Sequence, residues 1–189
     1  MIGNFNDAKE TPNNKFADSA LGKKSEGSVL DKFADLADKA LAVMCDGIKC
    51  CPIENGEWKG ERGNSKWCPD KNYVPLKANP EGKTWGEILK KYGIDGIYFK
   101  DGEPDFGPIS KGNVEIKGFS DDRTDNFDKA DIELAKQKGC SPEDVKRWRK
   151  ENGYTWHECR DMKTMQKVPS IVHNNISHSG GISEAKKGA

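Results

Sequence analysis

The sequence lacks the features that would place it in a membrane or on a signal-peptide export route. No apolar run approaches the roughly 20 residues needed to cross a bilayer. The amino terminus has no basic segment followed by an apolar core, so it does not resemble a signal peptide. We therefore expect no membrane segment, and we expect any export to depend on a larger chain or a separate machine.

Other common patterns are also missing. The chain has six cysteines but no Cys-x-x-Cys pair, and adjacent Cys50 and Cys51 suit neither a metal cluster nor a disulfide set. We expect reduced thiols, which are usual in proteins that act inside cells. No internal repeat occurs, which excludes a solenoid.

Charge is balanced over the whole chain but not along it. The formal net charge is zero, yet residues 134–189 contain 11 Lys and Arg and only 6 Asp and Glu. Residues 1–133 therefore contain the remaining 20 Lys and Arg and 25 Asp and Glu. A basic carboxyl-terminal segment suits a phosphate backbone, although such an excess is equally common on solvated helices. With 34% hydrophobic residues we expect only a modest core.

The composition divides the chain into three parts. Residues 1–27 are polar with few large apolar side chains, and we expect a flexible leader. Residues 28–52 hold a helix and a linker; the helix has an apolar face at helical spacing that packs on the core or on a preceding part of a longer chain. Residues 53–189 form the main domain, which is loop-rich up to Pro80.

The middle of the chain predicts short alternating elements. A capping box at Thr84 begins a helix that ends at Gly93, and residues 94–99 and 114–119 have strand character. A further helix, capped by Asp125 or Asn126, ends at Gly139. We interpret the charged residues in these turns as solvated loop ends, with a second acidic site as the alternative; they are Glu103, Asp105, Asp121, Asp122 and Arg123.

Ser141-Pro-Glu-Asp144 starts the next helix, with a serine cap, proline at its first position and acids in its first turn. Its basic residues are candidate phosphate contacts, and we expect Trp148 between them to pack inward. These candidate nucleic-acid-binding residues are Lys146, Arg147, Arg149 and Lys150.

All three histidines, His157, His173 and His178, fall in one stretch near the carboxyl terminus. Neutral imidazole is the commonest metal ligand, and three imidazoles can hold one divalent ion while leaving a coordination position open. Alternatively, the metal could be structural, stabilising the fold without taking part in catalysis. This clustering is the first functional signal in the sequence.

The residues around the histidines predict a strand, a strand and a helix. Residues 154–158 are β-prone, residues 161–164 form a turn in which Asp161 and Thr164 are structural, and residues 165–168 alternate as a second strand. Pro169 then begins a helix that runs to a stop at Gly180-Gly181. His173 and His178 are five residues apart, so either a π-like turn unites them or His178 follows the helix end.

The order Trp156-His157-x-x-x-Asp161, Met165-Gln-x-Val-Pro169, His173 and His178-Ser-Gly-Gly181 resembles the WHH-type nuclease domain of the HNH/endonuclease VII superfamily, found in bacterial polymorphic toxins. The resemblance covers residues 154–181. It implies an α+β fold of mixed helices and short strands that ends in a ββα-metal (HNH-like) motif. Residues 53–189 are then the nuclease domain.

The resemblance also implies the site. His157, His173 and His178 match the metal ligands, and position 158 matches the general base. Glu158 stands there in place of the second histidine of WHH, and Thr164 stands in place of the Asn of HNH. Either Glu158 is the base, or His157 is the base and Glu158 a ligand or orienting group.

These patterns predict a metal-dependent DNA endonuclease, the toxin module of an interbacterial competition system. The cofactor would be a divalent ion such as Zn, Mg, Mn or Ni, and the partners DNA and a cognate immunity protein. The toxin would be delivered without its own signal peptide and act in the target-cell cytoplasm. Two alternatives remain open: a non-catalytic zinc-stabilised nucleic-acid-binding module, and an RNase toxin with the same site.

Overall fold

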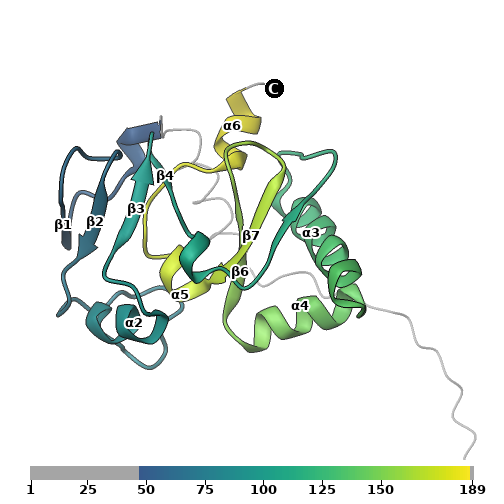
Figure 1. Ribbon diagram of the computed structural model, residues 1–189, viewed down its shortest axis with the longest axis horizontal. Helices are drawn as coiled ribbons and strands as arrows, with labels where there is room; N and C mark the ends of the chain where they lie inside the picture. The colour runs from purple at the N-terminus through teal and green to yellow at the C-terminus, as the bar shows by residue number, and fades with distance from the viewer. Residues whose placement is uncertain (1–46, 188–189) are drawn as a thin grey trace, which may run out of the picture.

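The computed structural model describes residues 47–187 (Figure 1). The predicted leader over 1–27 and the predicted helix of residues 28–44 lie outside the described residues. The domain boundary at residue 53 stays a prediction. In the described part, no helix is long and apolar enough to cross a membrane.

Two antiparallel sheets form the framework. The first has the order β1-β2-β3-β4, with bounds Gly56–Trp58, Lys66–Pro69, Ile97–Lys100 and Glu103–Pro104. The second has the order β5-β7-β6, with bounds Asn113–Glu115, Thr164–Pro169 and Tyr154–Glu158. Figure 1 shows the first sheet on the left and the second to the right of centre. The predicted α+β class is confirmed.

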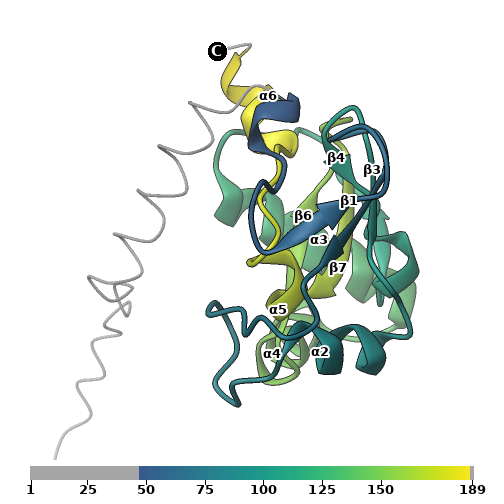
Figure 2. The same cartoon turned by 90° about the vertical axis from the view of Figure 1, so that its left-hand side faces the viewer.

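The helices join and cover these sheets. They are η1 Gly47–Cys50, α2 Trp85–Tyr92, η2 Gly107–Ile109, α3 Arg123–Lys138, α4 Pro142–Glu151, α5 Ser170–His173 and α6 Gly181–Lys187. Helix α2 lies below the first sheet, whereas α3 and α4 lie on the outer side of the second (Figure 1). Helix α5 lies beside β6 and β7, as Figure 2 also shows.

Local sequence signals fix several of these boundaries. A capping box is present at Thr84, as predicted, and the predicted serine cap at Ser141 is also part of a capping box. Helix α3 runs to Lys138, and Gly139, the predicted end, is its C-cap in the left-handed conformation. Its start differs from the prediction, because Asp122 rather than Asp125 or Asn126 accepts the capping hydrogen bond, from the Thr124 amide at 2.8 Å.

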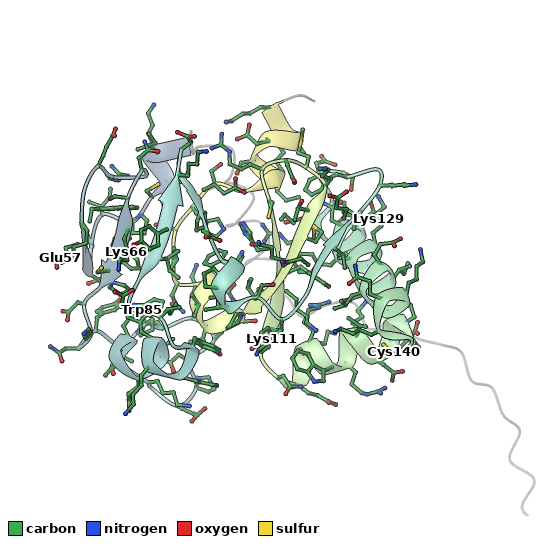
Figure 3. All side chains as sticks on the ribbon, viewed as in Figure 1. Glu57, Lys66, Trp85, Lys111, Lys129 and Cys140 are labelled. Carbon is green, nitrogen blue, oxygen red and sulfur yellow. The ribbon has the colours of Figure 1, made fainter. Side chains whose placement is uncertain are left out.

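Two separate cores flank the β6–β7 hairpin. In the first, Trp85 packs against Trp67 with ring centroids 6.2 Å apart, between α2 and the first sheet (Figure 3). In the second, Trp156 and Met165 pack against α3 and α4. Because β7 gives Val168 to the first core and Met165 to the second, the hairpin joins the two halves.

A buried ion pair holds the second core. The Asp131 carboxylate accepts hydrogen bonds from Arg149 Nε at 3.2 Å, Arg149 Nη2 at 2.8 Å and Trp156 Nε1 at 2.8 Å. Residue Asp131 is 1% exposed. The carboxylate therefore links α3 to α4 and to β6, and it fixes the residue next to His157.

The expected reduced state of the cysteines is only partly correct. Cys51, Cys68, Cys140 and Cys159 are free thiols. Cys50 is disulfide-bonded, so the prediction is wrong at that residue. Adjacent cysteines therefore differ in state, a difference that their spacing does not reveal.

We predict that Asp131→Ala lowers the free energy of unfolding by about 3–5 kcal/mol, because it leaves the buried Arg149 guanidinium unpaired. The matched control is Asp128→Ala, which breaks the exposed Lys146–Asp128 pair of the same two helices and should cost less than about 1 kcal/mol. Urea unfolding of both variants measures the difference. Equal losses would contradict the assigned role of Asp131.

Candidate metal centre

The hairpin that carries the first histidine forms as predicted. Strands β6 and β7 pair in antiparallel register, with His157 opposite Gln166. Asp161 closes the turn, since its carboxylate accepts from the Thr164 amide at 2.8 Å and from Thr164 Oγ1 at 2.5 Å. Met162 takes the positive φ that this turn requires. Thr164 thus stabilises the turn, as predicted.

The helix after the hairpin is shorter than predicted. Pro169 is the residue before α5 rather than its first residue, and α5 ends at His173. His178 lies in an extended segment beyond the helix, which is the second of the two predicted arrangements. Gly181 begins α6 rather than ending a helix, so the expected stop there is wrong.

The structure brings the three histidines together. One ring nitrogen from each of His157, His173 and His178 lies within 4.8 Å of the others. His157 Nδ1 is 3.3 Å from His173 Nε2, and the ring centroids are 4.9 to 5.4 Å apart. The three imidazoles therefore form one group, in which a nitrogen of each ring lies close to a nitrogen of the other two.

The outer nitrogens of two rings are already engaged. His178 Nδ1 lies 2.7 Å from the Ile176 carbonyl, which can only accept, so this nitrogen carries the hydrogen. His173 Nδ1 lies 3.1 Å from Asn174 Oδ1, and donation to this oxygen leaves Nε2 unprotonated. The lone pairs of both Nε2 atoms are thereby available to a cation.

The cluster is electrostatically suited to neutral imidazole. Burial, followed by the neighbouring His178, lowers the pKa of His173 to about 3. Burial also lowers the pKa of His178 to about 4, and it holds the pKa of His157 well below its usual value. All three rings are unprotonated near neutrality, which is the form that binds a metal.

A fully buried aromatic ring forms one wall of the cluster. Phe106, just before η2, has 0% exposure. Its ring centroid lies 5.0 Å from that of His157, 5.6 Å from that of His173 and 5.5 Å from that of His178. This ring contributes to the burial that lowers the three pKa values. Phe106 lies about 50 residues upstream in sequence, and no local signal had marked it.

Glu158 lies in a polar niche against α3, on the face of β6 opposite to His157. Its carboxylate accepts from Arg123 Nε at 3.1 Å and from Asn126 Nδ2 at 2.9 Å, and the residue is 5% exposed. Burial raises the pKa of Glu158, while Arg123 and Asn126 oppose that shift. The Arg123 charge also lowers the pKa of each histidine.

Arg123 and Asn126 are site neighbours that the sequence interpretation missed. Arg123 was grouped with solvated loop ends, and that interpretation is wrong at this residue because it pairs with buried Glu158. Asn126 is 0% exposed and also bonds to the Ser120 backbone through both ends of its amide. A polar side chain on the inner face of α3 was the only sequence signal for it.

The two glycines of the motif permit close backbone packing. A Cβ on Gly180 would lie 2.7 Å from the Glu158 carbonyl oxygen, and a Cβ on Gly181 would lie 2.5 Å from that of Cys159. Any side chain there would push the segment away from β6. The glycines therefore allow the segment that carries His178 to pack closely against the end of β6.

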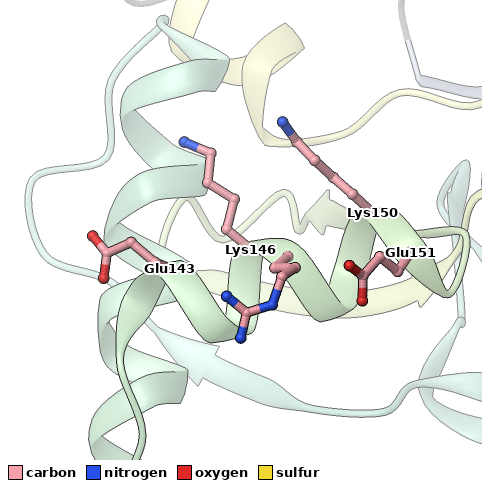
Figure 4. A pocket seen from close by; sticks show the side chains of 5 residues that line it. Glu143, Lys146, Lys150 and Glu151 are labelled. Carbon is pink, nitrogen blue, oxygen red and sulfur yellow. The ribbon is translucent and has the colours of Figure 1, made fainter. Parts of the chain in front are cut away.

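The basic residues of α4 occupy different environments. Arg149 is buried and paired with Asp131, so it does not face solvent, contrary to the prediction. Lys146, Arg147 and Lys150 line a surface hollow along α4 (Figure 4). This hollow includes none of the three histidines.

Trp148 does not pack inward as expected. It is 40% exposed, and its ring lies 5.2 Å from the Tyr154 ring, with Lys167 Nζ 4.2 Å from its centroid. The aromatic ring thus covers the Lys167 stem, and the position of Trp148 is a correction to the sequence interpretation. The buried residues of α4 are Val145 and Arg149 instead.

We predict that the metal-free protein loses stability as pH falls from about 6.5 toward 4. The unfolded chain protonates its histidines near pH 6.5, whereas the folded pKa values of His173 and His178 are lower, so the unfolded state binds more protons in this window. Each histidine contributes a slope of up to about 1.4 kcal/mol per pH unit. Urea unfolding with a chelator measures it, and His173→Gln/His178→Gln should flatten the dependence; an unchanged slope would refute this account.

A family model described as the DNase/tRNase domain of colicin-like bacteriocin matches residues 96–180. The matched span runs from just before β3 to Gly180 and includes all three histidines, Phe106, Arg123 and Glu158. No curated protein matches the chain. The family match supports a nuclease toxin domain, which is a hydrolase that acts on nucleic acid.

Proposed function

We propose that this chain is a metal-dependent DNA endonuclease with a WHH-type, HNH-like ββα-metal site, and that it is the toxin module of an interbacterial competition system. The observation that supports this most strongly is the convergence of three neutral imidazoles inside the span that matches a nuclease family. Three protein ligands with an open position are typical of catalytic rather than structural metal sites.

His157, His173 and His178 are the proposed ligands. They come from β6, α5 and the extended segment, so the folded hairpin and its following segment must both be in place. All three donors are nitrogen, which suits Zn or Ni, and Mg or Mn remain alternatives. A divalent ion held there would polarise the scissile phosphate and stabilise the departing oxygen.

Glu158 is the proposed general base. If His157 binds the ion, it cannot also accept the proton from water, and Glu158 occupies the position of the base in the resembled motif. Burial raises its pKa, which brings a carboxylate closer to the working pH of a base. Arg123 orients the carboxylate and, at 39% side-chain exposure, also lies where a phosphate oxygen can approach the site.

The substrate would contact surfaces beyond the histidines. Lys146, Arg147 and Lys150 on α4 are the proposed phosphate contacts, with Arg149 left out because it is buried. The basic character of residues 134–189 favours an acidic immunity protein as a partner. Delivery into the target-cell cytoplasm is part of the same proposal.

A cleavage assay separates the competing functions. Supercoiled plasmid and tRNA are offered side by side, with divalent metal and with chelator, since the matched family description names both DNase and tRNase. We expect metal-dependent cleavage of DNA. Cleavage of tRNA alone would favour the RNase, and binding without cleavage in any divalent metal would favour the non-catalytic module.

We predict that the purified protein binds about one divalent ion per chain and that His173→Ala lowers both metal content and cleavage. Elemental analysis after gel filtration measures the first, and plasmid cleavage the second. Gln137→Ala, on the outer end of α3, is the control and should match the natural protein. Stoichiometric metal in a variant with all three histidines replaced would contradict the ligand assignment.

We predict that Glu158→Gln lowers cleavage at least about 100-fold while metal binding is retained, because the amide keeps the shape but cannot take a proton. Cleavage by the natural protein should rise with pH through the raised pKa of Glu158, and Glu158→His should move that rise toward neutral pH. Glu115→Gln, an exposed acid on β5, is the control.

The pH profiles at saturating metal decide the role of Glu158. If Glu158→Gln cleaves at the natural rate with an unchanged profile, Glu158 takes no part in proton transfer. The base would then have to be sought in His157, and a different residue would complete the ligand set.

A further inference from the structure

A second carboxylate approaches the site from the other sheet. Glu103 lies on β4, and its Oε1 accepts a hydrogen bond from the Arg160 amide at 2.8 Å. This bond joins the first sheet to the end of the β6 hairpin. Glu103 is half-buried, although it belongs to a turn whose charged residues appear from sequence to be solvated.

Glu103 lies next to His157 rather than next to the other two histidines. An oxygen of Glu103, a ring nitrogen of His157 and the Cys159 sulfur lie within 4.8 Å of one another. This group and the three-histidine group have only His157 in common. Glu103 is therefore a carboxylate close to His157 that does not belong to the three-histidine group.

The two nitrogens of His157 have different surroundings. Nδ1 points to His173 Nε2 at 3.3 Å. Nε2 is buried and has no hydrogen-bond partner among the described residues. A buried polar nitrogen without a partner is unfavourable, and it identifies the side of the ring on which an acceptor is needed.

We propose that Glu103 is a positioning residue for His157, accepting a hydrogen bond from Nε2–H when Nδ1 serves as the ligand. This inference rests on the proposed function, in which His157 binds a divalent ion. A metal-ligating imidazole usually donates its other N–H to a carboxylate or carbonyl, which fixes the tautomer and raises its basicity as a ligand. Glu103 supplies that carboxylate from a part of the chain outside the ββα motif.

The chemistry of Glu103 favours this role over direct ligation. One of its oxygens accepts from the Arg160 amide, and its other oxygen can accept a hydrogen bond from His157. It also does not join the group in which His157, His173 and His178 converge. Glu103, His157 and Cys159 could instead hold a cation themselves. A Cys159 variant distinguishes that possibility from the positioning role.

The test uses Zn²⁺ alone as the probe, in competition with a chromophoric chelator. We expect Glu103→Gln to bind Zn²⁺ about 10- to 100-fold more weakly than the natural protein. The glutamine carbonyl can still accept from the Arg160 amide, but its other atom is an NH₂ group, which cannot accept from His157. Thermal unfolding of the metal-free variant should therefore stay close to that of the natural protein.

Two variants serve as controls. Glu184→Gln removes an equivalent charge that pairs with Arg160 at 3.2 Å but belongs to neither metal-competent group, and it should leave Zn²⁺ affinity unchanged. Cys159→Ala should also leave the affinity unchanged. If Cys159→Ala weakens Zn²⁺ binding as much as Glu103→Gln does, this side is a cation site and the positioning role is overturned.

Nitrogen-15 NMR of the imidazoles gives a readout that overall stability does not affect. With Zn²⁺ bound, His157 should carry its proton on Nε2 in the natural protein, and that resonance should broaden or shift in Glu103→Gln. Unchanged Zn²⁺ affinity and an unchanged resonance would overturn the inference. If the natural protein binds no Zn²⁺ at all, the proposed function fails first, and the two failures are therefore distinguishable.

Discussion

The arrangement of the site depends on one buried carboxylate, that of Asp131. It receives three hydrogen bonds, two from Arg149 and one from Trp156, and so fixes α3, α4 and β6 relative to one another. Side chains alternate along a strand, so a fixed Trp156 directs His157 to the opposite face. That face meets Phe106, and the imidazole is held against the first core.

The β6–β7 hairpin therefore separates two cores that differ in the polar groups they contain. On one side, aliphatic and aromatic groups pack around the Asp131 ion pair. On the other, Phe106 and its neighbours keep water from three imidazoles and hold them neutral. The low pKa values of the histidines are thus a property of the whole packing arrangement, and not of the short motif alone.

Local elements could be predicted from sequence because their causes are local. The capping boxes at Thr84 and Ser141 and the Asp161 turn involve residues within three positions of each other. The convergence of the histidines was also expected, since the motif prescribes it. Phe106, Arg123 and Glu103 were not found, because each reaches the site only through packing between elements far apart in the chain.

The glycine pair has a consequence for when the cluster exists during folding. His178 is held by backbone contact of residues 180 and 181 with the end of β6, so its ring reaches the others only after the hairpin has formed. An unfolded chain carries three dispersed imidazoles with little affinity for an ion. A chain kept unfolded would therefore carry no assembled site.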